Sequence, residues 1–144
     1  MFAPSAGRAA NLIPLPVRRP RLLLVTDSSE SRQRLLGKID LSRFDVTCAD
    51  SLPQLQHRLR RAFDAVLVDV SAPLLPASLR AIRASDENRA QPVLVEFSAK
   101  EDDPSLAGLL PLHRAMPCNL QEMMRLLSRL ADSPLPGRPT RNVL

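Results

Sequence analysis

The chain has 144 residues, 44% of them hydrophobic, and a formal net charge of +5. This length suits a single domain with a hydrophobic core, and no apolar run approaches the roughly 20 residues that span a bilayer. The N-terminal segment lacks the apolar stretch of a secretory signal, and Cys48 and Cys118 show no metal-binding spacing. We therefore expect a cytoplasmic protein with no membrane segment and no zinc site.

The positive charge belongs to the two ends of the chain. Residues 1–21 hold four arginines and residues 133–144 hold two, with no acid in either segment. Residues 22–132 hold 14 basic and 15 acidic side chains, so this middle part is nearly neutral. Proline/arginine-rich ends could contact nucleic acid or an acidic partner, but solvated, disordered tails are the favoured interpretation because no aromatic residues interleave for base stacking.

Five apolar or weakly alternating runs predict strands, and they alternate with segments of helical periodicity. The predicted strands are Arg21–Val25, Phe44–Ala49, Ala65–Val68, Pro92–Phe97 and Leu112–Met116. The first predicted helix covers about 30–38, and the next two are marked by apolar stripes, one of Leu52, Leu55, Leu59 and Ala62 and one of Leu75, Leu79 and Ile82. The fourth is a short segment, Ser105–Leu110, that Pro111 ends. The last is capped by Asn119, and its residues at core spacing are Leu120, Met123, Met124, Leu127 and Leu130.

This alternation of strand and helix predicts an α/β fold with a doubly wound parallel sheet. We expect a disordered tail over 1–20, one domain over 21–132 and a flexible tail over 133–144.

Asp69 ends the most apolar of the predicted strands. Open α/β sheets place their ligand sites at the carboxyl ends of strands, so this acid is a candidate site residue. An equally weighted alternative is a buried strand whose last residue merely reaches water. Neither His57 nor His113 has a nucleophile partner in sequence, and no glycine-rich phosphate loop is present, so we do not expect an enzyme.

Five positions together carry a family resemblance: Asp27, Asp69, Pro73, Ser98 and Pro117. Their order and spacing over about 21–131, with the phrase Asp-Ala-Val-Leu-Val-Asp-Val-Ser-Ala-Pro at 64–73, resemble the receiver domains of bacterial response regulators (CheY-like proteins). The resemblance implies a flavodoxin-like fold with strand order 2-1-3-4-5, here with a shortened fourth helix.

The resemblance also implies roles for individual residues. Asp69 would be the phosphoacceptor, and Mg2+ would be held by Asp27, Asp69 and the Ser71 carbonyl. The family usually has two acids after the first strand, and Thr26 replaces the first of them. We therefore expect any Mg2+ site to be weakened, and the sequence does not require the ion.

The largest departure from the family is Met116, which stands where the family has a lysine before the proposed cis-proline, Pro117. A thioether carries no charge, so the phosphorylated state would lose roughly 1.5–3 kcal/mol of charge-assisted bonding. If Lys100 or an arginine contacted Asp69 instead, this argument for a disabled relay would fail.

Other switch positions are altered as well. His113 replaces the aromatic switch residue, and Ala77 replaces a glycine. The hydroxyl position falls on Ser98, with Phe97 as a rival because the segment Pro92 to Ser98 is about one residue longer than the family pattern implies.

Two further features each allow two interpretations. Glu96 interrupts an apolar strand and either pairs with Arg114 or points out of the core at the end of the strand. Met123 and Met124, near Met116, favour core packing over a binding groove by about two to one, although methionine suits both.

Three functions fit these observations. The preferred one is an atypical or pseudo-receiver that regulates a protein partner, a sensor kinase or an effector, without a normal phosphorylation switch. The second is a stand-alone receiver phosphorylated on Asp69 in a two-component phosphorelay. The third is a nucleic-acid-associated regulator related to the degenerate receivers of transcription antiterminators, although nucleic-acid binding is not expected of the domain alone. A homodimer is compatible with each.

Overall fold

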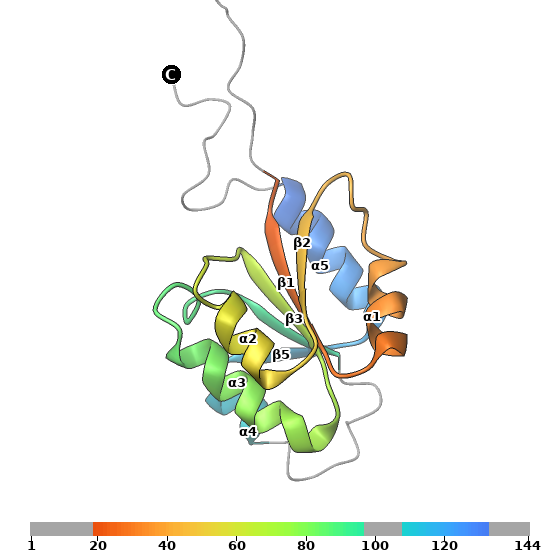
Figure 1. The fold of residues 1–144 in the computed structure, drawn as a ribbon. Coiled ribbons are helices and arrows are strands. Elements are labelled where there is room, and N and C mark those ends of the chain that lie inside the picture. Colours follow the sequence, from red (N-terminus) through yellow and green to blue (C-terminus); the bar gives the residue numbers. More distant parts are fainter. Residues whose placement is uncertain (1–18, 97–107, 133–144) are drawn as a thin grey trace, which may run out of the picture.

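A parallel five-stranded sheet organises the chain, as the computed structural model shows for the residues it describes, 19–96 and 108–132 (Figure 1). The strand order is β2-β1-β3-β4-β5, which confirms the predicted fold class. The strands are β1 (Arg21–Thr26), β2 (Asp45–Ala49), β3 (Ala65–Asp69), β4 (Val93–Glu96) and β5 (Ala115–Cys118). The helices are α1 (Ser29–Leu36), α2 (Leu52–Arg58), α3 (Leu75–Ala84), α4 (Leu109–Leu112) and α5 (Leu120–Asp132), and a short 3-10 turn, η1 (Ala72–Leu74), precedes α3.

The three central strands are buried on both faces, as their unbroken apolar sequences predict. Every residue of β3 and β4 is buried, and only the first residue of β1 is exposed. Their parallel register pairs Thr26 with Asp69 and Val68 with Val95, so these strands end at the same edge of the sheet.

Helices cover the sheet on both faces, which gives two hydrophobic layers (Figure 1). On one face α1 and α5 bury Leu35, Met123 and Leu127 against the sheet. On the other face α2, α3 and α4 bury Leu55, Leu79 and Leu110. The periodicity of the predicted stripes in α3 and α5 is confirmed by these contacts. Within the described residues, no helix is long and apolar enough to cross a membrane.

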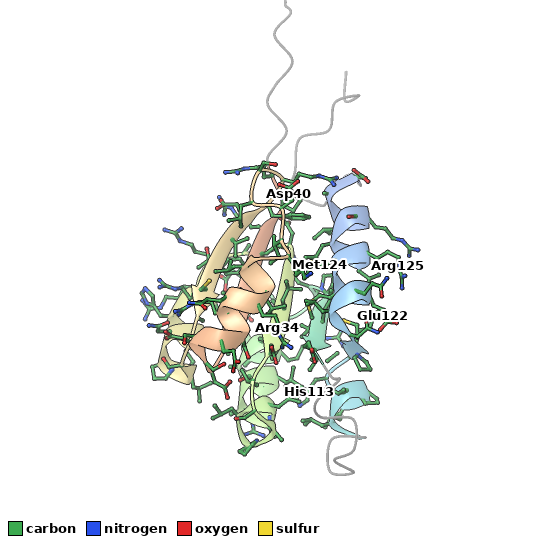
Figure 2. The ribbon with its side chains drawn as sticks, turned by 90° about the vertical axis from the view of Figure 1, so that its right-hand side faces the viewer. Arg34, Asp40, His113, Glu122, Met124 and Arg125 are labelled. Carbon is green, nitrogen blue, oxygen red and sulfur yellow. The ribbon has the colours of Figure 1, made fainter. Side chains whose placement is uncertain are left out.

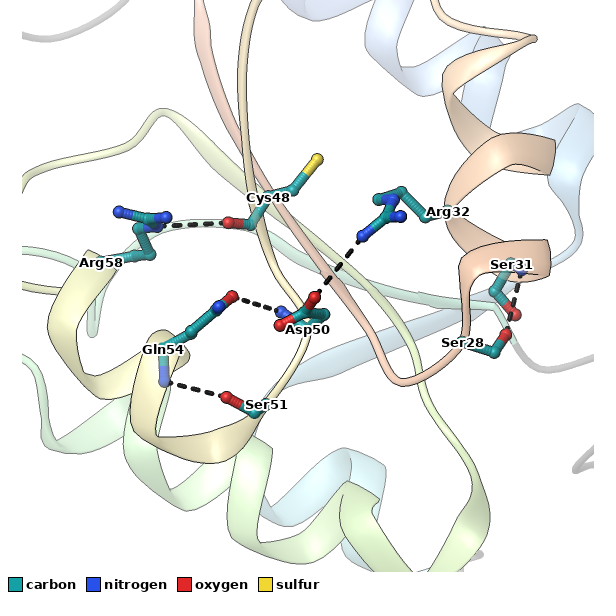
Figure 3. A network of polar contacts seen from close by, with 8 residues as sticks. All are labelled: Ser28, Ser31, Arg32, Cys48, Asp50, Ser51, Gln54 and Arg58. Carbon is teal, nitrogen blue, oxygen red and sulfur yellow. Dashed lines mark hydrogen bonds and ion pairs between the residues drawn. The ribbon is translucent and has the colours of Figure 1, made fainter.

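Side-chain caps fix where three helices begin. The Ser28 hydroxyl accepts from the N–H of Ser31 at 3.1 Å, and the Ser51 hydroxyl accepts from Gln54 at 3.3 Å (Figure 3). Asn119 and Glu122 exchange side-chain to backbone bonds of 2.8 and 2.9 Å at the start of α5. These arrangements satisfy N–H groups that have no partner within the helix.

Two predicted helices have different limits in the structure. The second ends at Arg58, so Ala62 lies beyond it and is exposed, and the predicted stripe is wrong at that position. Pro111 does not end the fourth helix but lies inside α4. Proline is tolerated there because the first turn of a helix leaves its N–H groups unbonded.

The fifth strand is also shifted from its prediction. It runs Ala115–Cys118, and the preceding Leu112 belongs to α4. The turn between them passes through Arg114, whose φ of 54° is unusual for a residue with a side chain. The strand thus begins after this turn, three residues later than the sequence suggested.

Candidate functional site at the carboxyl edge of the sheet

Three acids lie at the carboxyl edge of the sheet: Asp27 after β1, Asp69 at the end of β3 and Glu96 at the end of β4. Asp69 and Glu96 follow the paired residues Val68 and Val95, so they are neighbours on adjacent strands. Their side chains are only 8% and 3% exposed. Two buried carboxylates side by side require a cation, because unpaired charge is very unfavourable away from water.

Arg34 of α1 supplies that cation (its position is labelled in Figure 2). Its Nη2 donates to Asp69 Oδ2 at 2.6 Å and lies 3.6 Å from Glu96 Oε2. The guanidinium therefore bridges the ends of β3 and β4 from a third element. We call Arg34, Asp69 and Glu96 the arginine bridge.

Local structure places Arg34 at this edge. The Ser28 cap sets the start of α1, and Leu35 packs into the core, which fixes the rotation of the helix. Arg34 lies in the last turn of α1, where a cation also interacts favourably with the helix dipole. Its side chain is 46% exposed, so water still reaches one side of the bridge.

The arginine bridge changes two sequence interpretations. The argument for a disabled relay from the missing lysine fails, because an arginine, Arg34, contacts Asp69. Both alternatives for Glu96 are also wrong. Glu96 is buried and forms an ion pair with Arg34, and the Arg114 guanidinium donates instead to the Arg89 carbonyl at 3.1 Å.

Asp27 is held by the loop after β3. The N–H of Ser71 donates to Asp27 Oδ2 at 2.8 Å, which joins the two loops where the resemblance places the metal ligands. Thr26 beside it is buried, and its hydroxyl has no hydrogen-bond partner among the described residues.

These side chains do not form a ready magnesium site as they lie. In the described part of the chain, no three acids, cysteines or histidines converge as metal ligands do. Asp27 is bonded to the Ser71 N–H and Asp69 to Arg34, so an ion would have to displace the guanidinium. Magnesium binding by Asp27 and Asp69 stays a prediction.

The predicted switch and proline residues that the structure describes lie in β5 and in the turn before it. Met116 is 50% exposed on β5, in register with Leu94, and Pro117 pairs with Val95. The His113 carbonyl accepts from Arg83 Nε at 2.6 Å. Burial, and then the charges of Arg83 and Arg80, lower the pKa of its imidazole. The predicted hydroxyl residue Ser98, its rival Phe97 and Lys100 lie outside the described residues.

Sequence reasoning missed Arg34, although one signal pointed to it. Glu96 in an apolar strand indicates a buried acid that needs a cation, and α1 follows the strand next to β3. Arg34 precedes the inward-facing Leu35 and is the basic residue in the last turn of that helix.

With this geometry established, comparison with known proteins adds the fold family. No protein-family model matches the sequence, and no relative is found among curated proteins. Solved structures do match. The receiver domain of sensor histidine kinase PA1611 from Pseudomonas aeruginosa, which has a magnesium ion coordinated in its active-site cleft, is 20% identical with a TM-score of 0.64. The match covers 81% of this chain and 100% of that one.

The chain has the receiver fold. The chemotaxis response regulator CheY4 of Vibrio cholerae matches with a TM-score of 0.62 at 19% identity, over 78% of this chain and 99% of that one. The phosphorylated cyanobacterial phytochrome response regulator RcpA matches with a TM-score of 0.55 at 18% identity, over 83% and 100% of the two chains. The resemblance seen in the sequence is thus confirmed at the level of the receiver fold.

Proposed function

We propose that this receiver-fold chain is a signalling module that regulates a protein partner and does not use a normal phosphorylation switch. The observation that carries the proposal is the arginine bridge, in which the phosphoacceptor-equivalent Asp69 is buried and its Oδ2 lies 2.6 Å from the Arg34 guanidinium.

The second acid of the bridge opposes phosphorylation. An aspartyl phosphate carries about −1.5 to −2 charges in place of the single charge of the carboxylate, and on Asp69 it would lie beside Glu96, which is also buried. Like charges close together in a poorly solvated site are strongly unfavourable. The Arg34 guanidinium would then face a phosphoryl group and the Glu96 carboxylate instead of two carboxylates.

The origin of the cation also matters for signalling. Arg34 comes from α1, whereas the family lysine comes from the fifth strand, where this chain has Met116. A change at Asp69 would therefore act first on α1. No charged contact links it to β5 through Met116, since a thioether forms no ion pair.

The surface that we propose for the partner lies around α4 and β5. Leu112 is 74% exposed there, and Met116 contributes a second exposed apolar side chain. Met123 is buried and Met124 packs partly against the core on the α1 side (Figure 2), so these two methionines belong to the core. A sensor kinase or an effector protein is the kind of partner that this surface would serve.

A second candidate function is a receiver that is still phosphorylated on Asp69. Arg34 favours it in one respect, because a guanidinium next to the acceptor could bind phosphoryl oxygens in place of the lysine. In this case Mg2+ would have to enter between Asp27 and Asp69 while Arg34 turned toward the phosphoryl group. A nucleic-acid-associated function rests on the tails, most of which lie outside the described residues.

Phosphorylation chemistry separates the two candidates. The full chain would be incubated with Mg2+ and acetyl phosphate, or with beryllofluoride, and followed by intact mass and by amide NMR shifts. Our proposal predicts no adduct and no shift at residues next to Asp69. The matched samples are Asp69→Asn, which removes the acceptor, and Arg34→Gln/Glu96→Gln, which removes the arginine bridge without changing its net charge.

A stable adduct on the unmodified chain that is absent from Asp69→Asn would overturn the proposal in favour of a phosphorylated receiver. An adduct that forms only in the Arg34→Gln/Glu96→Gln variant would support it, because it would identify the bridge as the barrier.

A further inference from the structure

A basic groove lies beside the edge strand β2, away from the acidic carboxyl edge. It encloses a cavity of about 540 Å3. Four cationic or titratable side chains line it, His57, Arg58, Arg60 and Arg61, and its apolar lining includes Val46 and Phe63. We call this the β2–α2 groove.

The charges of the groove are not balanced by acids. Among residues 19–96 and 108–132, the arginines in ion pairs are Arg32, Arg34, Arg43 and Arg89, and none of these ion pairs involves a side chain of the groove. Three guanidinium groups thus gather around one cavity without a carboxylate at ion-pair distance in the described part of the chain.

Helix capping explains only part of this cluster. His57 and Arg58 lie in the last turn of α2, where cations interact favourably with the helix dipole. Arg60 and Arg61 follow the helix in a turn, with bonds from their N–H groups to the carbonyls of His57 and Arg58. Stabilising the helix end does not require these two additional charges.

The groove is also held in shape by buried hydrogen bonds. Asn88 is fully buried; its amide donates to the Arg61 carbonyl at 2.7 Å and its Oδ1 accepts from the Phe63 N–H at 2.7 Å. On the opposite wall, Arg58 Nε donates to the Cys48 carbonyl of β2 at 3.2 Å (Figure 3). The backbone that carries the arginines is therefore fixed before any ligand arrives.

We propose that the β2–α2 groove binds a small molecule with two or more phosphate groups, of the chemical class of a nucleoside diphosphate. Guanidinium groups present paired donors that match phosphate oxygens, and each terminal phosphate brings about −1.5 to −2 charges to a site that lacks acids. The cavity is within the range of about 300–1,000 Å3 that is usual for small-ligand sites.

The side chains that line the groove favour a small ligand over nucleic acid. Single-stranded nucleic acid is usually bound by stacking its bases on exposed aromatic side chains, but the one aromatic residue here, Phe63, is 3% exposed. This site is separate from Asp69, so the inference does not depend on the proposed function.

Isothermal titration calorimetry on the full chain tests this inference. ADP and inorganic diphosphate would be titrated separately, at two salt concentrations, into the unmodified chain and into Arg60→Gln/Arg61→Gln. Both altered residues are exposed, so the variant is expected to fold, which circular dichroism would check. Arg125→Gln on α5, on the opposite face of the sheet (Figure 2), is the matched control for loss of surface charge.

We expect the double variant to weaken binding by about tenfold or more, which is the usual effect of losing charge-assisted bonds, and the control to leave binding unchanged. Tighter binding of ADP than of diphosphate would add a contribution from the nucleoside, whereas equal binding would assign the affinity to the phosphates. Both results support the site.

Three results would overturn the inference. They are no heat of binding up to about millimolar ligand, equal weakening in Arg125→Gln, and binding of an RNA oligonucleotide that depends on Arg60 and Arg61 when neither small phosphate binds.

Discussion

The acidic edge and the basic groove of this molecule differ in whether their charged side chains form ion pairs. At the carboxyl edge, Asp69 and Glu96 are buried and share Arg34 from another element. In the β2–α2 groove, three arginines surround a cavity and none of the ion pairs of the described residues involves them.

This difference indicates that an added anion would bind at the groove and not at the acidic edge. A buried charge that already has its partner contributes to structure, and adding another charge disturbs that balance. Solvated arginines around a preformed cavity lose little when an anion replaces water. We therefore expect changes at the acidic edge to alter stability, and changes at the exposed groove arginines to alter binding.

The largest effect should come from Asn88, which supports the groove without lining it. Asn88→Ala would leave the buried N–H of Phe63 and the carbonyls of Leu59 and Arg61 without their amide partner. We expect a loss of about 2–4 kcal/mol in the free energy of unfolding, measured by urea denaturation. Asn88→Asp is the matched variant, since it keeps the acceptor for Phe63 but loses both donors. A loss below about 0.5 kcal/mol, the size of an ordinary surface substitution, would show that these bonds do not hold the turn.

Arg34→Met should have the next largest effect on the free energy of unfolding. It leaves two buried carboxylates without their guanidinium, and because Arg34 is 46% exposed we expect about 1–3 kcal/mol of destabilisation, below the range for fully buried pairs. Adding Glu96→Gln should recover part of the loss, since one of the two acids is then neutral. If a double-mutant cycle gave no coupling between the two positions, the bridge would not be a unit.

A smaller effect should depend on pH. The pKa of His113 is lowered by burial and by the nearby Arg83 and Arg80. The folded state therefore takes up the imidazole proton less readily than the unfolded state. The contribution of His113 is fully present above its unfolded value of 6.5 and is lost as the pH falls through the lower folded value. Between about pH 7.5 and pH 5, the melting temperature of the unmodified chain should fall relative to that of His113→Gln, whose side chain does not titrate. Parallel curves would contradict this.

The smallest effect on stability should come from the groove arginines. Arg60→Gln/Arg61→Gln removes exposed side chains that make no ion pair among those described, so the free energy of unfolding should change by less than about 0.5 kcal/mol. Removing mutual repulsion could even raise it. A large loss in urea denaturation would mean that these arginines serve the fold and would end the contrast between the two regions.

The sheet was largely predictable from the sequence because its signals are local. The apolar runs of β1, β3 and β4 and the stripe of α3 are fixed by residues close together in the chain. The register of β5 was not, since it depends on a left-handed turn at Arg114 and on a proline that the short α4 accommodates.

The candidate site divides in the same way. Asp69 was identifiable from its place at the end of an apolar strand, but its partner was not, because Arg34 is 35 residues away and reaches it only after α1 packs. The basic groove was likewise hidden. Its arginines are adjacent in sequence, but the cavity forms only where the turn after α2 meets the edge strand.

The bond between Arg58 and Cys48 has a consequence for the sheet as a whole. β2 lies at one end of the strand order, and its Asp45 N–H is bonded to Pro20 on the inner side. Alternate peptide groups face opposite sides of a strand, so the Cys48 carbonyl lies on the outer side, where a further strand would pair. A strand from another copy of the chain would have to displace this guanidinium in order to pair with β2. Arg58 therefore opposes aggregation through this edge strand, because unpaired edge strands otherwise tend to pair with other chains.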